Sequence, residues 1–212
     1  MSPPEEIADA LRRFRRRRAR RWGLRRAGLA VAVIGGATGP AVVLTRRTDP
    51  AGTGLSSTGP GQFALPGGRA DRWEPASGAA RRQLAGELGM RLPPESTLGL
   101  LDDYVTHSGL VITPVVLWAG TRWAQHRVPV AEVLTVPFAD LDVEPVFVAS
   151  AGSDRSVIRL PVQGGWLHAP TAAVLHQFRE VVLYGRRTRV AHLAPTPHSA
   201  GSAGLFESRL PR

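Results

Sequence analysis

Residues 27–44 constrain the fold most, because they form eighteen consecutive residues without a charge directly after an arginine cluster. An uncharged stretch of this length is typical of a membrane-spanning helix. However, six turn-forming residues at 35–40 occupy its middle and would be a poor centre for a helix in lipid. Short β-branched segments at 29–34 and 41–45 flank the turn, so the sequence predicts a hairpin of two buried strands. We therefore expect a cytoplasmic protein with no transmembrane segment.

The composition is that of a globular chain with many loops. Hydrophobic residues make up 43% of the 212 residues and charged residues 21%, and there are 23 Gly and 18 Pro. The chain has no Cys, which excludes disulfides, thiolate nucleophiles, Cys-based zinc sites and iron–sulfur clusters. Its six histidines show no metal-ligand spacing, and the sequence has neither a G-x-S-x-G elbow nor a P-loop pattern.

Positive charge is concentrated at the N-terminal end. The net charge is +10 and ten arginines lie between Arg12 and Arg26, so the remainder of the chain is close to neutral. Such a segment could bind nucleic acid or an anionic membrane surface, and its field could also favour phosphate-rich small substrates. The alternative is a solvated helix that rests on the domain.

The residues before and within this cluster predict a helix. Ser2 stands as N-cap before two prolines, and Glu5 is placed to complete a capping box. Ile7, Leu11 and Phe14 follow at helical spacing and form one narrow apolar stripe. The stripe favours a helix that packs its apolar side on the domain.

The second half of the chain predicts an α/β arrangement. Residues 98–101 and 111–118 are expected to be strands, with Pro114 marking a bulge or an edge, and residues 130–136 continue toward another strand.

A helix is expected to open at Pro170 and to end at Gly185, with Arg179 and Glu180 on its outward side.

Residues 67–90 contain the most specific motif. The stretch GGRADRWEPASGAARRQLAGELGM resembles the Nudix box, which reads Gly, five residues, Glu, seven residues, then Arg-Glu-U-x-Glu-Glu-x-Gly-U, where U is a bulky aliphatic residue. The spacing agrees at Gly68, Glu74, Arg82, Leu84, Glu87, Gly89 and Met90. Two positions differ, because Gln83 and Gly86 stand where the family has glutamate.

Further stretches resemble the coenzyme A pyrophosphatase branch of this family. Upstream, Leu44-Thr45-Arg46-Arg47 and GQFALPGG at 61–68 resemble its additional motif, and residues 98–120 and 168–185 also look like that branch. Residues 56–59 and Trp73 depart from the branch pattern.

The resemblance covers about residues 26–195 and implies an α/β/α Nudix sandwich with a mixed β-sheet. We therefore expect a basic helix at 1–25, a Nudix-type domain at 26–195 and a flexible tail at 196–212. By the same resemblance, the expected substrate-binding residues are Arg46, Arg47, Gly67 and Gly68.

The box implies metal chemistry. Hydrolysis of a diphosphate requires neutralisation of oxygens that gain charge as water attacks phosphorus, and Mg²⁺ or Mn²⁺ held by carboxylates supplies it. On a helix, positions 83, 86 and 87 share one face, so three glutamates there would bind the metals together. Here only Glu87 is a carboxylate and the expected metal ligand, since Gln83 offers a neutral amide and Gly86 offers nothing.

The resemblance also assigns supporting residues, and other carboxylates of the chain could enter the site. Glu74 and Arg82 are expected to form an ion pair that fixes the loop to the helix, and with Gln83 and Glu87 they make up the candidate catalytic residues. Carboxylates that could replace the missing ligands are Asp71, Asp102, Asp103 and Glu144.

Two functions therefore remain open. The first is a Nudix-type hydrolase of a nucleoside diphosphate derivative, similar to coenzyme A, with a degenerate active site, weakly bound Mg²⁺ or Mn²⁺ and weakened catalysis. The second is an inactive Nudix domain that binds a nucleotide or a partner.

Overall fold

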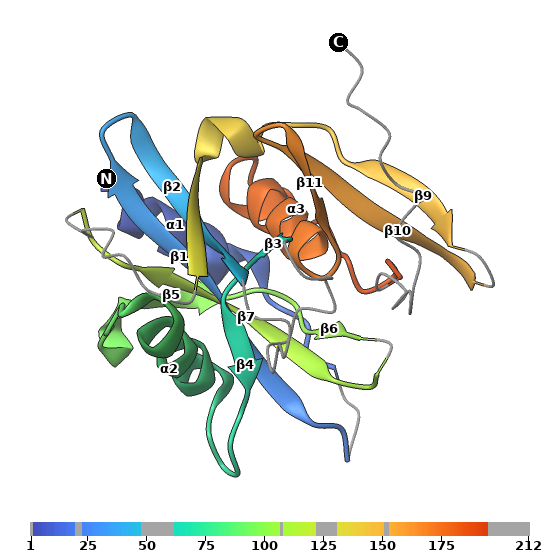
Figure 1. Cartoon of the computed structure of the whole chain (residues 1–212), viewed down its shortest axis with the longest axis horizontal. Coiled ribbons are helices and arrows are strands. Elements are labelled where there is room, and N and C mark those ends of the chain that lie inside the picture. Colours follow the sequence, from blue (N-terminus) through green and yellow to red (C-terminus); the bar gives the residue numbers. More distant parts are fainter. Residues whose placement is uncertain are drawn as a thin grey trace.

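Two sheets and three helices make up the described part of the computed structural model (Figure 1). It describes residues 2–19, 23–47, 62–106, 108–121, 131–150 and 153–194, without the side chains of 47, 131, 150 and 153. None of the helices in these ranges is long and apolar enough to span a membrane.

The uncharged segment folds as the predicted hairpin. Strand β1 (Arg26–Gly36) pairs antiparallel with β2 (Gly39–Arg47), with Val33 opposite Val42. The side chains of β1 are fully buried between Leu29 and Val33. Burial on both faces explains a strand without charges, because each face of the sheet is covered by helices.

The hairpin lies within a mixed sheet. Its remaining strands are β3 (Phe63–Ala64), β4 (Gly67–Arg69), β5 (Thr97–Leu100), β6 (Tyr104–Val105), β7 (Val111–Trp118) and β8 (Ala131–Pro137). Strand β7 is parallel to β1, whereas β2, β4, β5, β6 and β8 pair antiparallel with their neighbours. The path across the sheet is β3-β2-β1-β7-β5, with β4 on β1, β6 on β7 and β8 on β2.

Pro114 lies inside this sheet and not at its edge. It pairs with Leu29 of β1 on one side, and on the other side it faces the interruption between β5 and β6, where its carbonyl accepts a hydrogen bond from Leu101 N at 3.1 Å. The N–H that proline lacks would point toward this interruption, so no ladder hydrogen bond is lost.

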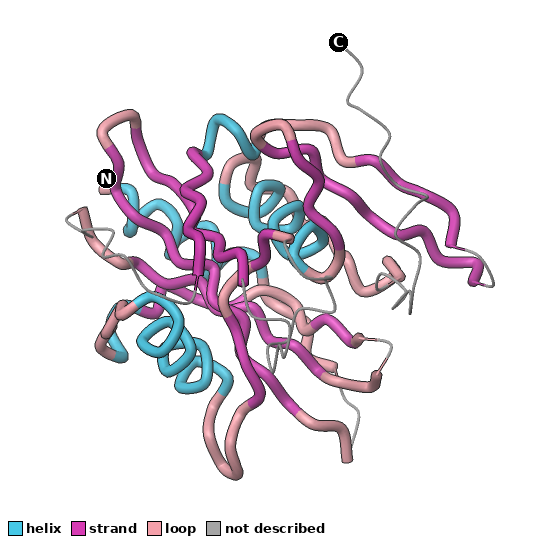
Figure 2. The backbone as a smooth tube through the Cα atoms, in the orientation of Figure 1, coloured by secondary structure: helices cyan, strands magenta, loops and turns pink. Residues whose placement is uncertain are grey.

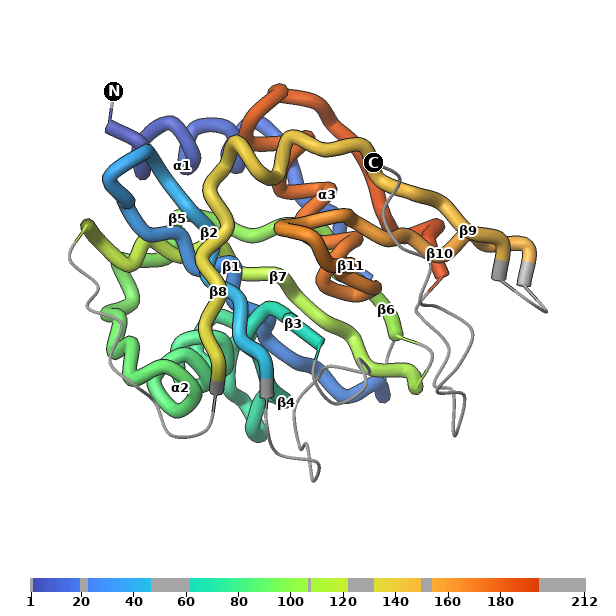
Figure 3. Tube along the Cα trace, turned by 45° about the horizontal axis from the view of Figure 1, so that its top comes forward, coloured from blue at the N-terminus to red at the C-terminus, as the bar shows by residue number. Residues whose placement is uncertain are grey.

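Helices cover both faces of the main sheet. Helix α2 (Ala76–Leu88) packs one face through Ala80, Leu84 and Leu88. Helices α1 (Pro3–Phe14) and α3 (Thr171–Val182) lie on the other side, as the helices in Figure 2 and the turned view in Figure 3 show. The structure therefore confirms the expected α/β/α layering with a mixed sheet.

Helix α1 packs on the domain as its apolar stripe predicts. Ile7, Leu11 and Phe14 are all buried and belong to the same core cluster as α3. Ser2 N donates to Glu5 Oε2 at 2.9 Å, as the predicted capping box requires. Both the cap and the stripe thus follow from the sequence.

A second, smaller sheet packs against α3. It consists of β9 (Val146–Ser150), β10 (Ser153–Val162) and β11 (Gly165–His168), all antiparallel. Short 3₁₀ helices at Pro94–Ser96 and Phe138–Leu141 complete the described elements.

The last helix differs from the sequence prediction in two respects. It ends at Val182, three residues before Gly185. Arg179 and Glu180 are buried, not outward, because surrounding segments supply partners for both charges. Arg179 contacts Glu144 at 3.5 Å, and Glu180 accepts a hydrogen bond from Thr188 Oγ1 at 2.9 Å.

Candidate active site

Two glycines in the sheet allow α2 to approach it closely. A Cβ on Gly28 of β1 would lie 2.1 Å from the carbonyl oxygen of Ala76, and a Cβ on Gly68 of β4 would lie 2.1 Å from Gln83 Nε2. Both gaps are far below van der Waals contact, so a side chain at either position would displace the helix or the Gln83 amide. The helix begins after Pro75, ends at Leu88 and is capped by Gly89, whose φ of 67° is in the left-handed region that glycine adopts readily.

The expected ion pair joins the loop before α2 to the middle of the helix. Arg82 Nε and Nη2 donate to the two carboxylate oxygens of Glu74 at 3.0 and 2.8 Å, and Arg82 Nη2 also donates to the carbonyl oxygen of Arg69 at 2.9 Å. Glu74 closes the loop by accepting from Asp71 N at 2.9 Å. The hydrogen bond from Arg82 lowers the pKa of Glu74, and the same bond raises the pKa of the Arg82 guanidinium.

The face of α2 that corresponds to the metal face of the box carries a single carboxylate. Gln83 and Glu87 are partly buried, whereas Gly86 is exposed and a Cβ added there would meet open space within 4 Å. Thr45 Oγ1, which is buried in β2, donates to Glu87 Oε2 at 3.3 Å. Thr45 is a contact that the sequence reasoning missed, although its place in the Leu-Thr-Arg-Arg motif beside Arg46 was a usable signal.

The carboxylates that could have completed a metal site each contact an arginine instead. Asp102 and Asp103 are buried among arginines, Glu144 contacts Arg179, and Asp71 lies 3.6 Å from Arg82. Within the ranges that the structure describes, no three His, Asp or Glu side chains are grouped closely enough to hold a metal ion. These residues therefore do not fit a multi-metal cluster. The oxygen donors on this face of α2 are the Glu87 carboxylate, which accepts from Thr45 Oγ1, and the neutral Gln83 amide.

The expected substrate-binding residues do not all converge on one point. Arg46 Nε donates to Glu132 Oε2 at 2.8 Å, and its guanidinium stacks over the Phe63 ring at 5.0 Å. Its charge is thus already paired across β2 and β8. Arg47 ends β2, and its side chain lies outside the described part of the structure.

Gly67 and Gly68 lie in β4 directly under α2. A Cβ on Gly67 would lie 2.8 Å from the carbonyl oxygen of Gly28, so the strand accepts no side chain there. Their observed role is to bring the box helix and β1 together.

Comparison with known proteins decides the family. The NUDIX domain pattern matches residues 24–149, which include β1, β4 with Gly67 and Gly68, and all of α2. The chain belongs to the Nudix family. Members of this family are hydrolases that act on pyrophosphate bonds and generally use divalent metal ions.

Several solved structures are similar to this Nudix chain. A Nudix hydrolase of M. smegmatis, RenU, is 26% identical over 78% of this chain and 90% of its own length, with a TM-score of 0.49. A MutT/Nudix family protein of Enterococcus faecalis is 15% identical over 76% of this chain and 61% of its own length, with a TM-score of 0.48. The Nudix domain of Shewanella oneidensis NrtR, crystallised with ADP-ribose, is 21% identical over 56% of this chain and 76% of its own, with a TM-score of 0.39. Among curated proteins none matches significantly.

Proposed function

We propose that this Nudix domain binds a nucleoside diphosphate derivative at the box and hydrolyses it far more slowly than an enzyme with three box glutamates. The observation that supports the proposal is the single carboxylate, Glu87, on the face of α2 that also carries Gln83 and Gly86. This is the weakened hydrolase that the sequence predicts. In the extreme case, the domain would bind its ligand without hydrolysing it.

The rate of hydrolysis depends on how charge at the reacting phosphorus is neutralised. Divalent ions held by several carboxylates would neutralise the oxygens that gain charge as water attacks. A neutral amide at Gln83 is a weak ligand for a hard cation and cannot act as a general base. The Glu74–Arg82 pair and the glycine contacts of α2 keep the scaffold intact, so we expect ligand binding to be retained while hydrolysis is slowed.

We propose a substrate of the coenzyme A type, because residues 44–47 and 61–68 resemble the motif of that branch. Gly67 and Gly68 would place main-chain groups next to the diphosphate. Arg46, stacked on Phe63, and Arg47 would contact the remainder of the ligand.

The test is turnover of coenzyme A with Mg²⁺, comparing the natural chain with the double variant Gln83→Glu plus Gly86→Glu. The site has room for both changes, because Gln83 and Glu have the same shape and the position of Gly86 is open. We expect the double variant to be at least about 100-fold faster, the lower end of what a positioned catalytic carboxylate contributes.

Gly86→Ala is the matched control, because it improves the helix without adding a carboxylate, and it should leave turnover unchanged. Calorimetric titration of coenzyme A into the natural chain without metal should still give saturable binding. An equally high rate in the natural chain and the double variant would contradict the proposal.

A further inference from the structure

A cavity of about 370 Å³ lies on the opposite side of β1 from Glu87. Its lining includes Arg17, Arg18, Asp102, Asp103, Arg155 and Arg189. The lining comes from the segment after α1, the interruption between β5 and β6, strand β10 and the loop after α3. Since Glu87 contacts β2 and this interruption lies beyond β7, the cavity and the box are separated by at least two strand spacings, ~10 Å.

The two aspartates in the cavity are already saturated with donors. Asp102 accepts hydrogen bonds from Arg17 N at 2.6 Å and from Arg189 Nη1 at 2.7 Å. Asp103 accepts from Ala19 N at 2.9 Å and from Thr113 Oγ1 at 2.7 Å.

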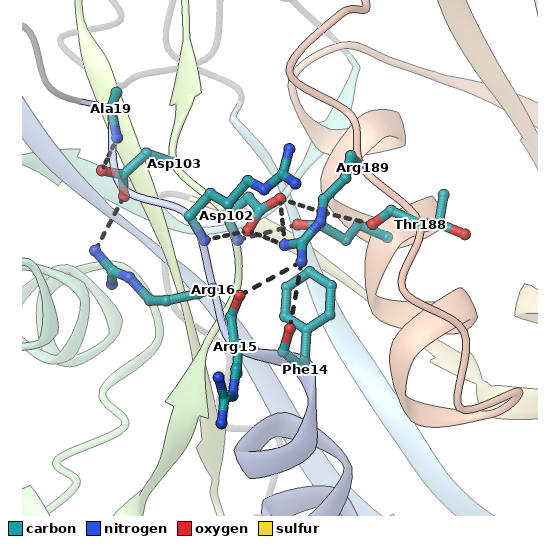
Figure 4. Close-up of polar contacts among 10 residues, drawn as sticks. Phe14, Arg15, Arg16, Ala19, Asp102, Asp103, Thr188 and Arg189 are labelled. Carbon is teal, nitrogen blue, oxygen red and sulfur yellow. Dashed lines mark hydrogen bonds and ion pairs between the residues drawn. The ribbon is translucent and has the colours of Figure 1, made fainter.

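Figure 4 shows Asp102 turned toward Arg189, and Asp103 toward Arg16 and Ala19. Arg16 Nη2 contacts Asp103 at 3.3 Å. The side chains of the two aspartates are 2% and 0% exposed. Because each buried carboxylate has an arginine and a main-chain N–H as partners, neither offers an open ligand position to a cation.

Positive charge remains after these pairs are counted. Arg189 is matched by Asp102, and Asp103 is matched by Arg16, which leaves Arg17 and Arg18 with no carboxylate partner among the described residues. Both are exposed residues that line the cavity. On the other side, Arg155 Nε donates to the carbonyl oxygen of His192 at 2.9 Å, which fixes this cation in the wall.

We propose that this cavity is a binding site for a small phosphate-bearing anion, of the size of inorganic diphosphate or a mononucleotide, and that Arg17 and Arg18 bind its charge. The volume lies in the range of small-molecule sites. Guanidinium groups match phosphate oxygens in geometry as well as charge. The proposal is independent of hydrolysis at the box, because the two sites share no residue.

The experiment is calorimetric titration of inorganic diphosphate into the full chain, with a chelator present so that no divalent ion bridges the ligand to Glu87. The test variant is Arg17→Gln plus Arg18→Gln, which keeps most of each side-chain stem. The matched control is Arg12→Gln plus Arg13→Gln, which removes the same charge from exposed positions outside the lining. Melting curves check that both variants are folded.

We expect saturable binding to the natural chain, an affinity within about twofold in the control, and a loss of at least tenfold in the test variant. Equal weakening of both variants would overturn the proposal, because the effect would then be one of net charge. Two other results would also overturn it: no saturable binding to the natural chain, or a loss of diphosphate binding in Glu87→Gln. A loss of affinity for a single-stranded oligonucleotide with unchanged diphosphate binding would instead assign these arginines to nucleic acid.

Discussion

The Glu74–Arg82 pair holds the loop of the box against the middle of α2 through two hydrogen bonds between side chains. Replacing Arg82 by Met keeps the length of the side chain and removes both bonds. The side chain of Arg82 is 43% exposed, so solvent screening reduces the contribution of the pair. We expect Arg82→Met to lower the free energy of unfolding by about 1 kcal/mol at pH 7, measured by urea denaturation.

The loss of stability in Arg82→Met should become smaller at low pH. The pKa of Glu74 is lowered by folding from the ordinary value of 4.5, so the pair stabilises the protein above that pH and is lost as the pH falls through the lower, folded-state pKa. The difference between the natural chain and Arg82→Met should therefore shrink below pH 4.5. Arg91→Met, at an exposed position, is the control; a difference for Arg82→Met that is constant with pH would contradict the assignment.

The sequence was enough to predict the contacts of some residues and not those of others. The Glu74–Arg82 pair was predictable because a motif with fixed spacing specifies both partners. The partners of Asp102 and Asp103 were not, since Arg16 and Arg189 are about ninety residues distant in the chain and only the fold brings them together. The burial of Arg179 and Glu180 escaped prediction for the same reason.

At the scale of elements, the contact between β1 and α2 depends on the absence of a side chain at Gly28. A Cβ there would collide with main-chain atoms of Ala76 and Ala80, at 2.1 and 2.7 Å, which cannot rotate away. Gly28→Ala should therefore destabilise the protein by about 3 kcal/mol, as overpacking of a tight core does. Thermal and urea unfolding measure the change.

Gly86, which lies in α2, provides a control for which the opposite change in stability is expected. Gly86→Ala adds its methyl group in open space and removes a glycine from a helix interior, so we expect a gain of about 1 kcal/mol. Equal and small effects of the two substitutions would show that α2 does not lie against β1 as closely as described.

Elements marked by a turn or by apolar spacing in the nearby sequence were predictable. Features that depend on strand pairing between distant residues were not. Turn formers between two apolar segments predicted the hairpin, and the apolar stripe of α1 predicted its packing on the domain. The hairpin of β10 and β11 also has a local signal, Gly164-Gly165 between two apolar segments, which the sequence reasoning did not use. The position of Pro114 opposite the gap between β5 and β6 depends on pairing distant in sequence.

At the scale of the whole molecule, α1 belongs to the main core although it carries part of the arginine cluster. Phe14 is 2% exposed, and its ring lies 4.3 Å from the guanidinium carbon of Arg189. We expect Phe14→Ala to destabilise the chain by about 3 kcal/mol, a fall of roughly 6–12 °C in Tm for a protein of this size.

The same experiment tests the expected division of the chain at residue 25. If α1 is part of one cooperative unit, Phe14→Ala lowers the Tm of a single transition, and the exposed control Arg13→Ala changes it little. A separate early transition with an unchanged main Tm would mean that residues 1–25 form an independent appendage.

The proposed function rests on the claim that α2 provides one carboxylate, whereas a metal cluster needs several. Titration with Mn²⁺, followed by electron paramagnetic resonance of the free ion, tests this most directly in the natural chain and in the Gln83→Glu plus Gly86→Glu variant. We predict weak binding of at most one ion at the box of the natural chain, and binding at least about tenfold tighter in the variant. Two or more Mn²⁺ ions bound tightly to the natural chain, and released in Glu87→Gln, would contradict the claim.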